Sequence, residues 1–181
     1  MHLTNSTVLG IGDPQARLRV YIGNRPNTVI EHATPGITPL VAGNICRIGQ
    51  DCGNGWRKVF NVFAKLAYAL PSPASFRQGH PRWQAFRDNS LLQANSDCAL
   101  MFSEPKEFSK DAIHIISGKT FANTLHIAPS LHWITPDFAI DAQRHVVVCP
   151  YFDYRQLSNS KILFLVELLA EYQYLPRLSG K

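Results

Sequence analysis

A group of aromatic and charged side chains follows Pro150 just beyond the strand expected at residues 145–149, namely Tyr151, Phe152, Asp153, Tyr154 and Arg155. Their phenols, carboxylate and guanidinium are suited to stacking on a planar ligand and hydrogen-bonding its edge or a phosphate. The same residues also fit a scaffold, in which Asp153 or Ser158 caps the last helix and Arg155 pairs with Asp153. The candidate ligand-binding residues in this group are Tyr151, Asp153, Tyr154 and Arg155.

Two earlier turns also carry polar residues. Gly23-Asn24-Arg25-Pro26-Asn27 follows the strand expected at 18–22, and Gly118-Lys119-Thr120 follows the strand expected at 113–116. The second turn opens a helix, so its amides and the Lys119 ammonium can meet an anion. A tight turn with a solvent-facing lysine is the alternative. The candidates from these turns are Asn24, Arg25, Asn27 and Lys119, and no residue is assigned a catalytic role.

The segments that position these turns alternate between strand and helix patterns. An apolar strand at 113–116 leads into a helical pattern at 120–125, and one at 145–149 leads into an apolar helix at 160–172. Such β-branched strands followed by helices predict parallel strands covered on both faces. Ligands bind beyond the carboxyl ends of these strands, so the turns at 117–119 and 150–155 are the expected site. We predict one α/β domain with a three-layer α/β/α arrangement and a mainly parallel central sheet.

The remaining chain contains one strong helix signal and two weakly patterned stretches. Trp56 to Leu70 repeats apolar residues at three–four spacing, which predicts an amphipathic helix. Further elements are expected at 81–92 (helix), 97–102 (strand) and 131–134 (short strand). Residues 1–16 are expected to form a loose lead-in. The glycines and prolines of 28–55 predict a long loop, either lining a site or forming a disordered flap.

Composition excludes several classes of protein. The chain has 181 residues, 45% hydrophobic and 17% charged, which is typical of a globular domain rather than a disordered chain. Its apolar runs are far shorter than the roughly 18 residues that span a bilayer, and the N-terminus lacks a signal-peptide pattern. We therefore expect a soluble cytoplasmic protein with no membrane partner. The net charge of +5 permits an anionic partner, although scattered solubilising charge accounts for it equally well.

Neither a cofactor nor a metal is predicted. No Gly-x-Gly-x-x-Gly follows 18–22, and Gly118-Lys119-Thr120 lacks the upstream glycine of a Walker loop. The seven histidines show no metal-ligand spacing, and Cys46 and Cys52 lack a second pair. His114 and His145 begin strands, which favours a structural role. His126 and His132 lie nearer loops and are acid–base candidates.

Three turns over residues 18–173 resemble those of the uracil-DNA glycosylase superfamily. They are Gly23-Asn24-Arg25-Pro26, Gly118-Lys119-Thr120 and Cys149-Pro150-Tyr151. The resemblance implies base excision, with Asn24 nearest to the residue that orients or activates water in that family. Cys149 stands where the family has a histidine, and Tyr151 where it has a serine.

These observations predict a protein that binds a planar anionic ligand, a nucleotide or nucleic acid, at the carboxyl edge of the sheet. One alternative is a divergent base-excising glycosylase. The other is a non-enzymatic domain whose basic surface meets a protein partner.

Overall fold

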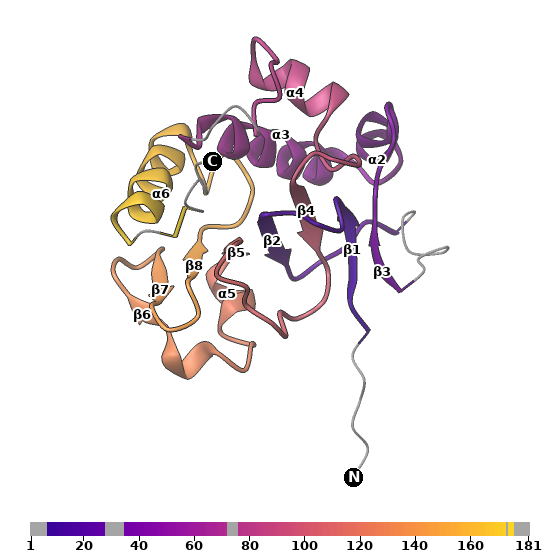
Figure 1. Cartoon of the computed structure of the whole chain (residues 1–181). Coiled ribbons are helices and arrows are strands. Elements are labelled where there is room, and N and C mark those ends of the chain that lie inside the picture. Colours follow the sequence, from indigo (N-terminus) through magenta and orange to yellow (C-terminus); the bar gives the residue numbers. More distant parts are fainter. Residues whose placement is uncertain (1–6, 28–34, 72–75, 173, 176–181) are drawn as a thin grey trace.

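The computed structural model describes residues 7–27, 35–71, 76–172 and 174–175. Within these ranges it contains eight strands, five α-helices and one 3₁₀ helix (Figure 1). The strands are β1 (Leu9–Gly12), β2 (Leu18–Ile22), β3 (Gly36–Thr38), β4 (Cys98–Met101), β5 (Ile113–Ser117), β6 (His132–Trp133), β7 (Ala139–Asp141) and β8 (Val146–Cys149). The helices are α2 (Asn44–Asp51), α3 (Asn54–Ala69), α4 (Trp83–Asn89), α5 (Lys119–Ala122), α6 (Asn159–Glu171) and the 3₁₀ helix η1 (Ala128–Ser130).

All eight strands form one mixed sheet in the order β3-β1-β4-β2-β5-β8-β7-β6. The four central strands, β4, β2, β5 and β8, are mutually parallel. On the flanks, β1 is antiparallel to β4, and β7 is antiparallel to both β8 and β6. The predicted α/β class is therefore confirmed, and the sheet is mixed, with four parallel and three antiparallel strand pairings.

The two faces of the sheet are covered unequally. Alternate strand residues point to opposite faces, so Val20 of β2 packs with α3 and α6, whereas Tyr21 packs with α5 on the other face. The first face carries a layer of helices in which α2, α4 and α6 pack against α3 (Figure 1). On the second face, the described residues supply only the four-residue α5, the 3₁₀ helix η1 and connecting segments. The predicted three-layer arrangement is thus present in part.

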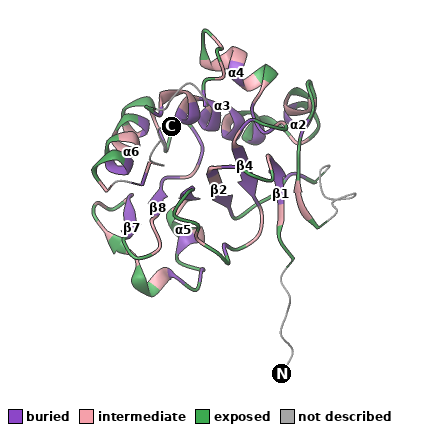
Figure 2. Ribbon diagram, viewed as in Figure 1, coloured by how far each residue is buried: buried purple, intermediate pink, exposed green. Residues whose placement is uncertain are grey.

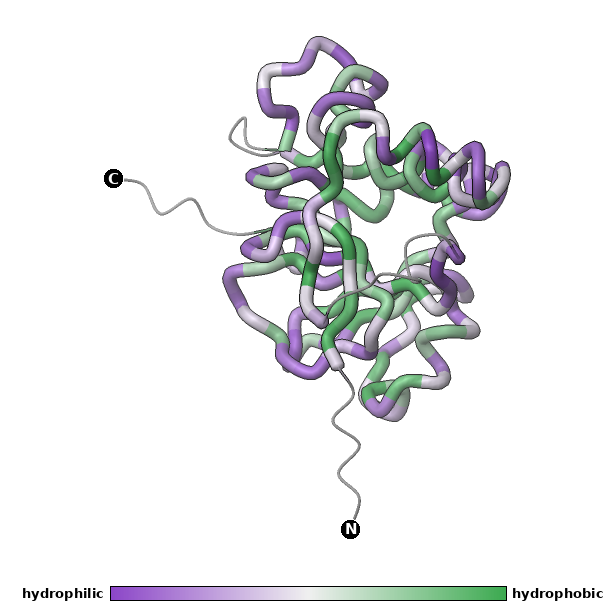
Figure 3. The backbone as a smooth tube through the Cα atoms, turned by 90° about the vertical axis from the view of Figure 1, so that its right-hand side faces the viewer, coloured by the Kyte–Doolittle hydropathy of each residue, from purple (hydrophilic) through white to green (hydrophobic). Residues whose placement is uncertain are grey.

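Helix α3 provides the largest apolar surface of the helical layer. Phe60, Phe63 and Leu66 are fully buried, and they recur at the three–four spacing that brings side chains to one face of a helix. Burial is strongest in the central strands and on the inner side of α3 (Figure 2). The hydropathy of the chain follows the same division, with hydrophilic stretches along the outer turns and helices (Figure 3).

Several predicted elements match closely. The strand predicted at 18–22 is β2 residue for residue, and β5 and β8 differ from their predictions by one residue. The helix predicted at 160–172 is α6, shifted by one residue at each end. Helices predicted at 81–92 and 120–125 are shorter than expected, as α4 and α5. The short strand β7 was not predicted.

The predicted loose lead-in at 1–16 is wrong for its described strand β1. Gly10 and Gly12 suggested a broken pattern, but both lie where the backbones of β1 and β4 approach closely. A Cβ at Gly10 would come within 2.9 Å of the Leu100 carbonyl oxygen, and one at Gly12 would collide with the Cys98 carbonyl oxygen. These glycines permit the strand pairing instead of preventing it. Residues 1–6 lie outside the described part of the chain.

The predicted long loop at 28–55 is also wrong for much of its length. It contains β3, α2 and the first residues of α3, while residues 28–34 lie outside the described ranges. Gly43 precedes α2 in a left-handed conformation with φ of 88°, and Asn44 Oδ1 accepts a 2.8 Å hydrogen bond from the Val41 amide. The glycine therefore begins a helix rather than extending a loop.

Within the described ranges, no helix combines the length and apolar character needed to cross a membrane.

Gly12→Ala tests the close approach of β1 and β4. We expect it to lower the free energy of unfolding by about 3 kcal/mol, because it adds a steric collision at a residue with φ of 128°. Gly55→Ala is the matched control, since nothing lies within 4 Å of its added Cβ. It should stabilise α3 by about 0.5 kcal/mol. Urea unfolding of both variants measures this, and equal stabilities would contradict the explanation of β1.

Candidate functional site

A cavity of about 870 Å³ lies at the carboxyl ends of β2, β5 and β8. We call it the strand-end cavity. Residues from three turns, the following helices and the β6–β7 connection line it: Gly23, Asn24, Ser117, Gly118, Lys119, Thr120, Phe121, Thr124, Asp137, Pro150, Tyr151, Arg155, Gln156 and Lys161.

The cavity sits where the chain connections diverge. From β2 the chain passes through α3 to β4 on one side, whereas from β5 it passes through α5 to β8 on the other. The two connecting helices also lie on opposite faces of the sheet. The ends of β2 and β5 are therefore left open between them, which is where ligands bind in open α/β sheets.

The first turn meets the third through side chains. The Asn24 amide nitrogen donates a 3.1 Å hydrogen bond to the Tyr151 hydroxyl. That hydroxyl in turn donates to Asn24 Oδ1 at 3.2 Å. Gly23 allows the turn to pass closely over α5, because a Cβ there would lie 2.9 Å from the Phe121 ring. The contact between Asn24 and Tyr151 joins residues 127 positions apart in the sequence.

The second turn is tied to the end of β8. The Gly118 amide donates to the Cys149 carbonyl at 2.9 Å, and the Ser117 hydroxyl accepts from the Phe152 amide at 3.1 Å. Gly118 has φ of 102°, a conformation that favours glycine. The backbones of the second and third turns are thereby held side by side.

Lys119 lines the strand-end cavity and contacts the β6–β7 hairpin. Its Nζ donates to the Pro136 carbonyl at 3.1 Å and sits 4.6 Å from the centre of the Trp133 ring. Because α5 has only four residues, it provides no extended helix dipole for an anion. The lysine charge is therefore the main attraction that this turn offers to an anion.

The third turn divides its residues between core and surface. Phe152 is fully buried and packs edge-on against Phe63 of α3 at 5.9 Å between ring centres. Tyr151 is half-buried beside the cavity, whereas Tyr154 is 56% exposed. The third turn therefore contains both a core residue, Phe152, and rings that are open to the cavity or to solvent, Tyr151 and Tyr154. The N-terminal cap of the following helix, α6, is Ser158, whose hydroxyl accepts a hydrogen bond from the Lys161 amide at 3.4 Å.

Asp153 is buried and held by two cations. The Arg155 guanidinium lies 2.7 Å from Asp153 Oδ2, and the Lys58 ammonium lies 3.5 Å from the same atom. The hydrogen bond from the Arg155 side chain, with the Arg155 amide and the positive charges of Arg155 and Lys58, holds the pKa of Asp153 well below its usual range. A carboxylate with such a low pKa is a weak base. Its contacts with Arg155 and Lys58 instead hold these two cations in position.

Half of the predicted site residues line the strand-end cavity, namely Asn24, Lys119, Tyr151 and Arg155. The other half, Arg25, Asn27, Asp153 and Tyr154, do not line it. The main residues missed are Lys161 and Asp137, which form an ion pair of 2.8 Å across the cavity wall. Their positions in the first turn of a helix and next to Pro136 gave no sign that α6 and the β6–β7 hairpin would meet.

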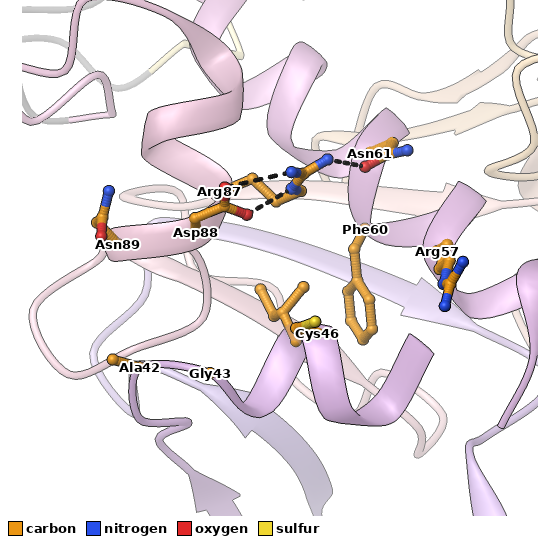
Figure 4. Close-up of a pocket in the computed structure, with 10 residues that line it drawn as sticks. Ala42, Gly43, Cys46, Arg57, Phe60, Asn61, Arg87, Asp88 and Asn89 are labelled. Carbon is orange, nitrogen blue, oxygen red and sulfur yellow. Dashed lines mark hydrogen bonds and ion pairs between the residues drawn. The ribbon is translucent and has the colours of Figure 1, made fainter. Parts of the chain in front are cut away.

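A second cavity of about 530 Å³ lies away from the strand ends, between α2, α3 and α4. Figure 4 shows Arg87 on its rim, where it donates to Asn61 at 2.6 Å and pairs with Asp88 at 2.8 Å. Cys46 of α2 and the buried Phe60 of α3 line the same cavity. We favour the strand-end cavity as the functional site because three turns converge there at the carboxyl ends of parallel strands.

Among the described residues, neither a histidine nor Cys149 lines the strand-end cavity. His114 is buried, and its ring nitrogens bond the Tyr21 hydroxyl at 3.1 Å and the Ser109 carbonyl at 2.9 Å. Burial lowers the pKa of His114 to about 4, so it is a neutral structural residue, as predicted. Burial raises the pKa of the Cys149 thiol. The acid–base candidate His126 instead pairs with Glu104 at 2.6 Å.

Residues 9–170 match the sequence model of a family of unknown function, DUF6942. No curated protein and no solved structure matches the chain.

The low pKa of Asp153 predicts how stability depends on pH. A carboxylate whose pKa is lower in the folded than in the unfolded state stabilises the fold above about pH 4, and this contribution disappears as pH falls toward the folded pKa. Asp153→Asn should therefore cost about 2 kcal/mol at pH 7, with a difference from the parent protein that shrinks below about pH 4. Urea unfolding from pH 3 to pH 7 measures the difference. The exposed Asp111→Asn is the control, and a constant difference across this range would contradict the assignment.

Phe152→Ala and Tyr154→Ala test the division of roles within the third turn. Phe152 is fully buried, so its truncation should cost about 3–5 kcal/mol and lower the melting temperature by many degrees. Tyr154 is largely exposed, so its truncation should change stability by no more than about 1 kcal/mol. Thermal and urea unfolding measure both. A large loss for Tyr154→Ala would place its ring in the scaffold.

Proposed function

Since the chain belongs to DUF6942, a family of unknown function, we propose from its own residues that it binds the nucleotide unit of a nucleotide or nucleic acid. The carrying observation is the convergence of three turns on one cavity that combines cations, an aromatic ring and an amide. Its volume of about 870 Å³ is in the range of small-molecule sites, which span about 300–1,000 Å³.

The cations of the cavity support recognition of a phosphate. Lys119, Arg155 and Lys161 reach it from three different elements, and Asp137, which pairs with Lys161, is the one carboxylate among its described lining residues. The Lys119 hydrogen bond goes to a carbonyl oxygen, which leaves its full charge available to an anion. Arg155 is held by Asp153 and presents a guanidinium that is 65% exposed. A planar guanidinium with free N–H groups suits a phosphate.

The ring of Tyr151 and the amide of Asn24 support recognition of a base. The ring is half-buried and held in place by its hydroxyl contact with Asn24. An aromatic ring offers a stacking surface, and an amide has a donor and an acceptor for the edge of a base. Thr120, Thr124 and Gln156 add further hydrogen-bonding groups to the lining.

Calorimetric titration with uridine monophosphate, adenosine monophosphate and the matching nucleosides tests this proposal. We expect Arg155→Gln and Lys119→Gln each to weaken the binding of the monophosphates by at least about tenfold, since a lost charge-assisted hydrogen bond costs about 1.5–3 kcal/mol. Nucleoside affinity should change little in these variants. Tyr151→Ala should weaken nucleosides and monophosphates alike, because it removes the stacking surface.

Lys110→Gln is the control, because Lys110 is exposed and lies outside the cavity lining. The absence of nucleotide binding, or equal effects of Lys110→Gln and Arg155→Gln, would refute the proposal.

Base excision is a second candidate, because Asn24 of the Gly-x-x-Pro turn faces the cavity beside Tyr151. Incubation with uracil-containing single- and double-stranded DNA separates the possibilities. Cleavage that is lost in Asn24→Ala favours the enzyme. Salt-sensitive binding without cleavage favours a binding protein. A protein that does neither would instead fit a protein-interaction domain.

A further inference from the structure

A third hollow, of about 400 Å³, lies on the helical layer, between α3, α4 and α6. We call it the outer groove. It shares no lining residue with the strand-end cavity and combines aromatic rings, cations and aliphatic side chains: Lys65, Tyr68, Ala69, Arg77, Trp83, Asn159, Ile162 and Leu163.

Trp83 lies between two cations. The Lys65 ammonium is 5.1 Å from the centre of the indole ring, and the Arg87 guanidinium is 5.4 Å from it. Arg87 is held in place by Asn61 and Asp88 (Figure 4). The half-buried indole is therefore a positioned aromatic surface beside the Lys65 ammonium and an Arg87 guanidinium that pairs with Asp88.

Tyr68 forms a second fixed ring in the groove. Its hydroxyl donates to the His80 carbonyl at 3.1 Å, and the Arg77 guanidinium lies 4.8 Å from the ring centre. Arg77 Nε also donates to the Tyr68 carbonyl at 2.9 Å. Leu163 of α6 adds an apolar edge that is 59% exposed. The groove thus offers apolar ring surface next to cations that no carboxylate among its lining residues neutralises.

A row of cations leads from the strand-end cavity to the outer groove. Arg155 lines the cavity and shares Asp153 with Lys58 of α3, whose ammonium lies 5.5 Å from the centre of the Tyr154 ring. Lys65 follows Lys58 by seven residues, which is about two turns, or 10 Å, along the same side of the helix. The exposed ring of Tyr154 and the two lysines therefore lie on a path between the two hollows.

We infer that the outer groove binds unpaired bases of a single-stranded nucleic acid, while a nucleotide several positions away along the same strand occupies the strand-end cavity. Single-strand sites combine a positive track for the backbone with aromatic rings for the bases, and both are present here. A duplex would hide the base faces that Trp83 and Tyr68 are placed to meet. An acidic peptide would use the cations but not the rings. The inference rests on the proposed function, because it extends the same ligand beyond the cavity.

Fluorescence anisotropy with labelled oligothymidylates of about three and about twelve nucleotides tests the path. We expect the longer strand to bind at least tenfold more tightly than the shorter one. Trp83→Ala should weaken the longer strand about tenfold, the usual effect of losing one base–aromatic stack. Lys65→Gln should weaken it less and lower its salt dependence by about 0.7 in logarithmic slope. Neither variant should change the binding of the short strand.

Lys110→Gln serves as the matched charge control, and Lys65→Gln tests the groove even where Trp83→Ala does not fold. Equal affinity for both lengths, or variant losses that are the same for both, would overturn the inference and leave nucleotide binding at the cavity intact. Polyglutamate that displaces the longer strand at equal charge concentration would also overturn it, in favour of an acidic protein partner. If mononucleotides fail to bind while the longer strand still depends on Trp83, the proposed cavity function fails and the groove stands.

Discussion

The alignment of β2, β5 and β8 at their carboxyl ends is the constraint on which the candidate site depends. In the parallel register, Ser117 of β5 lies opposite both Ile22 of β2 and Cys149 of β8. Ser117 is 1% exposed, and its hydroxyl accepts the Phe152 amide that follows β8. Because a buried polar group must be satisfied, this bond and the register support one another. All three turns therefore leave the sheet at the same edge.

The turn after β8 joins this edge to the helical layer. Phe152 inserts between sheet and helix and contacts Phe63 of α3, while Tyr151 faces the cavity and Tyr154 faces solvent. Asp153 then links Arg155 of the cavity to Lys58 of α3. The segment from Tyr151 to Arg155 thus connects the core, the strand-end cavity and Lys58 on the outer side of α3. A change in its packing should reach all three.

Much of the central architecture is predictable from local patterns. The alternating pattern at 18–22 and the three–four spacing at 56–70 predict β2 and α3, because alternation and helical periodicity are properties of short segments. The same reasoning placed polar turns after the strands, and with them Asn24, Lys119, Tyr151 and Arg155 of the cavity. Strand followed by helix implies parallel strands, and parallel strands place their following turns at one edge.

Only the tertiary structure decided which distant residues meet. By local propensity, Gly10 and Gly12 predict an interrupted strand. The close approach of β4 that requires these glycines cannot be recognised from the residues adjacent to them in the sequence. The pairing of Lys161 with Asp137 likewise depends on where α6 passes the β6–β7 hairpin. Asp153 pairs with Arg155, which was one of the sequence-based alternatives, but it gains Lys58 as a second partner because α3 lies beside it. Local sequence patterns determined the central strands β2, β5 and β8, the helices α3 and α6, and the polar turns after the strands. Strand order and helix packing, which act across more than a hundred residues, determined the cavity.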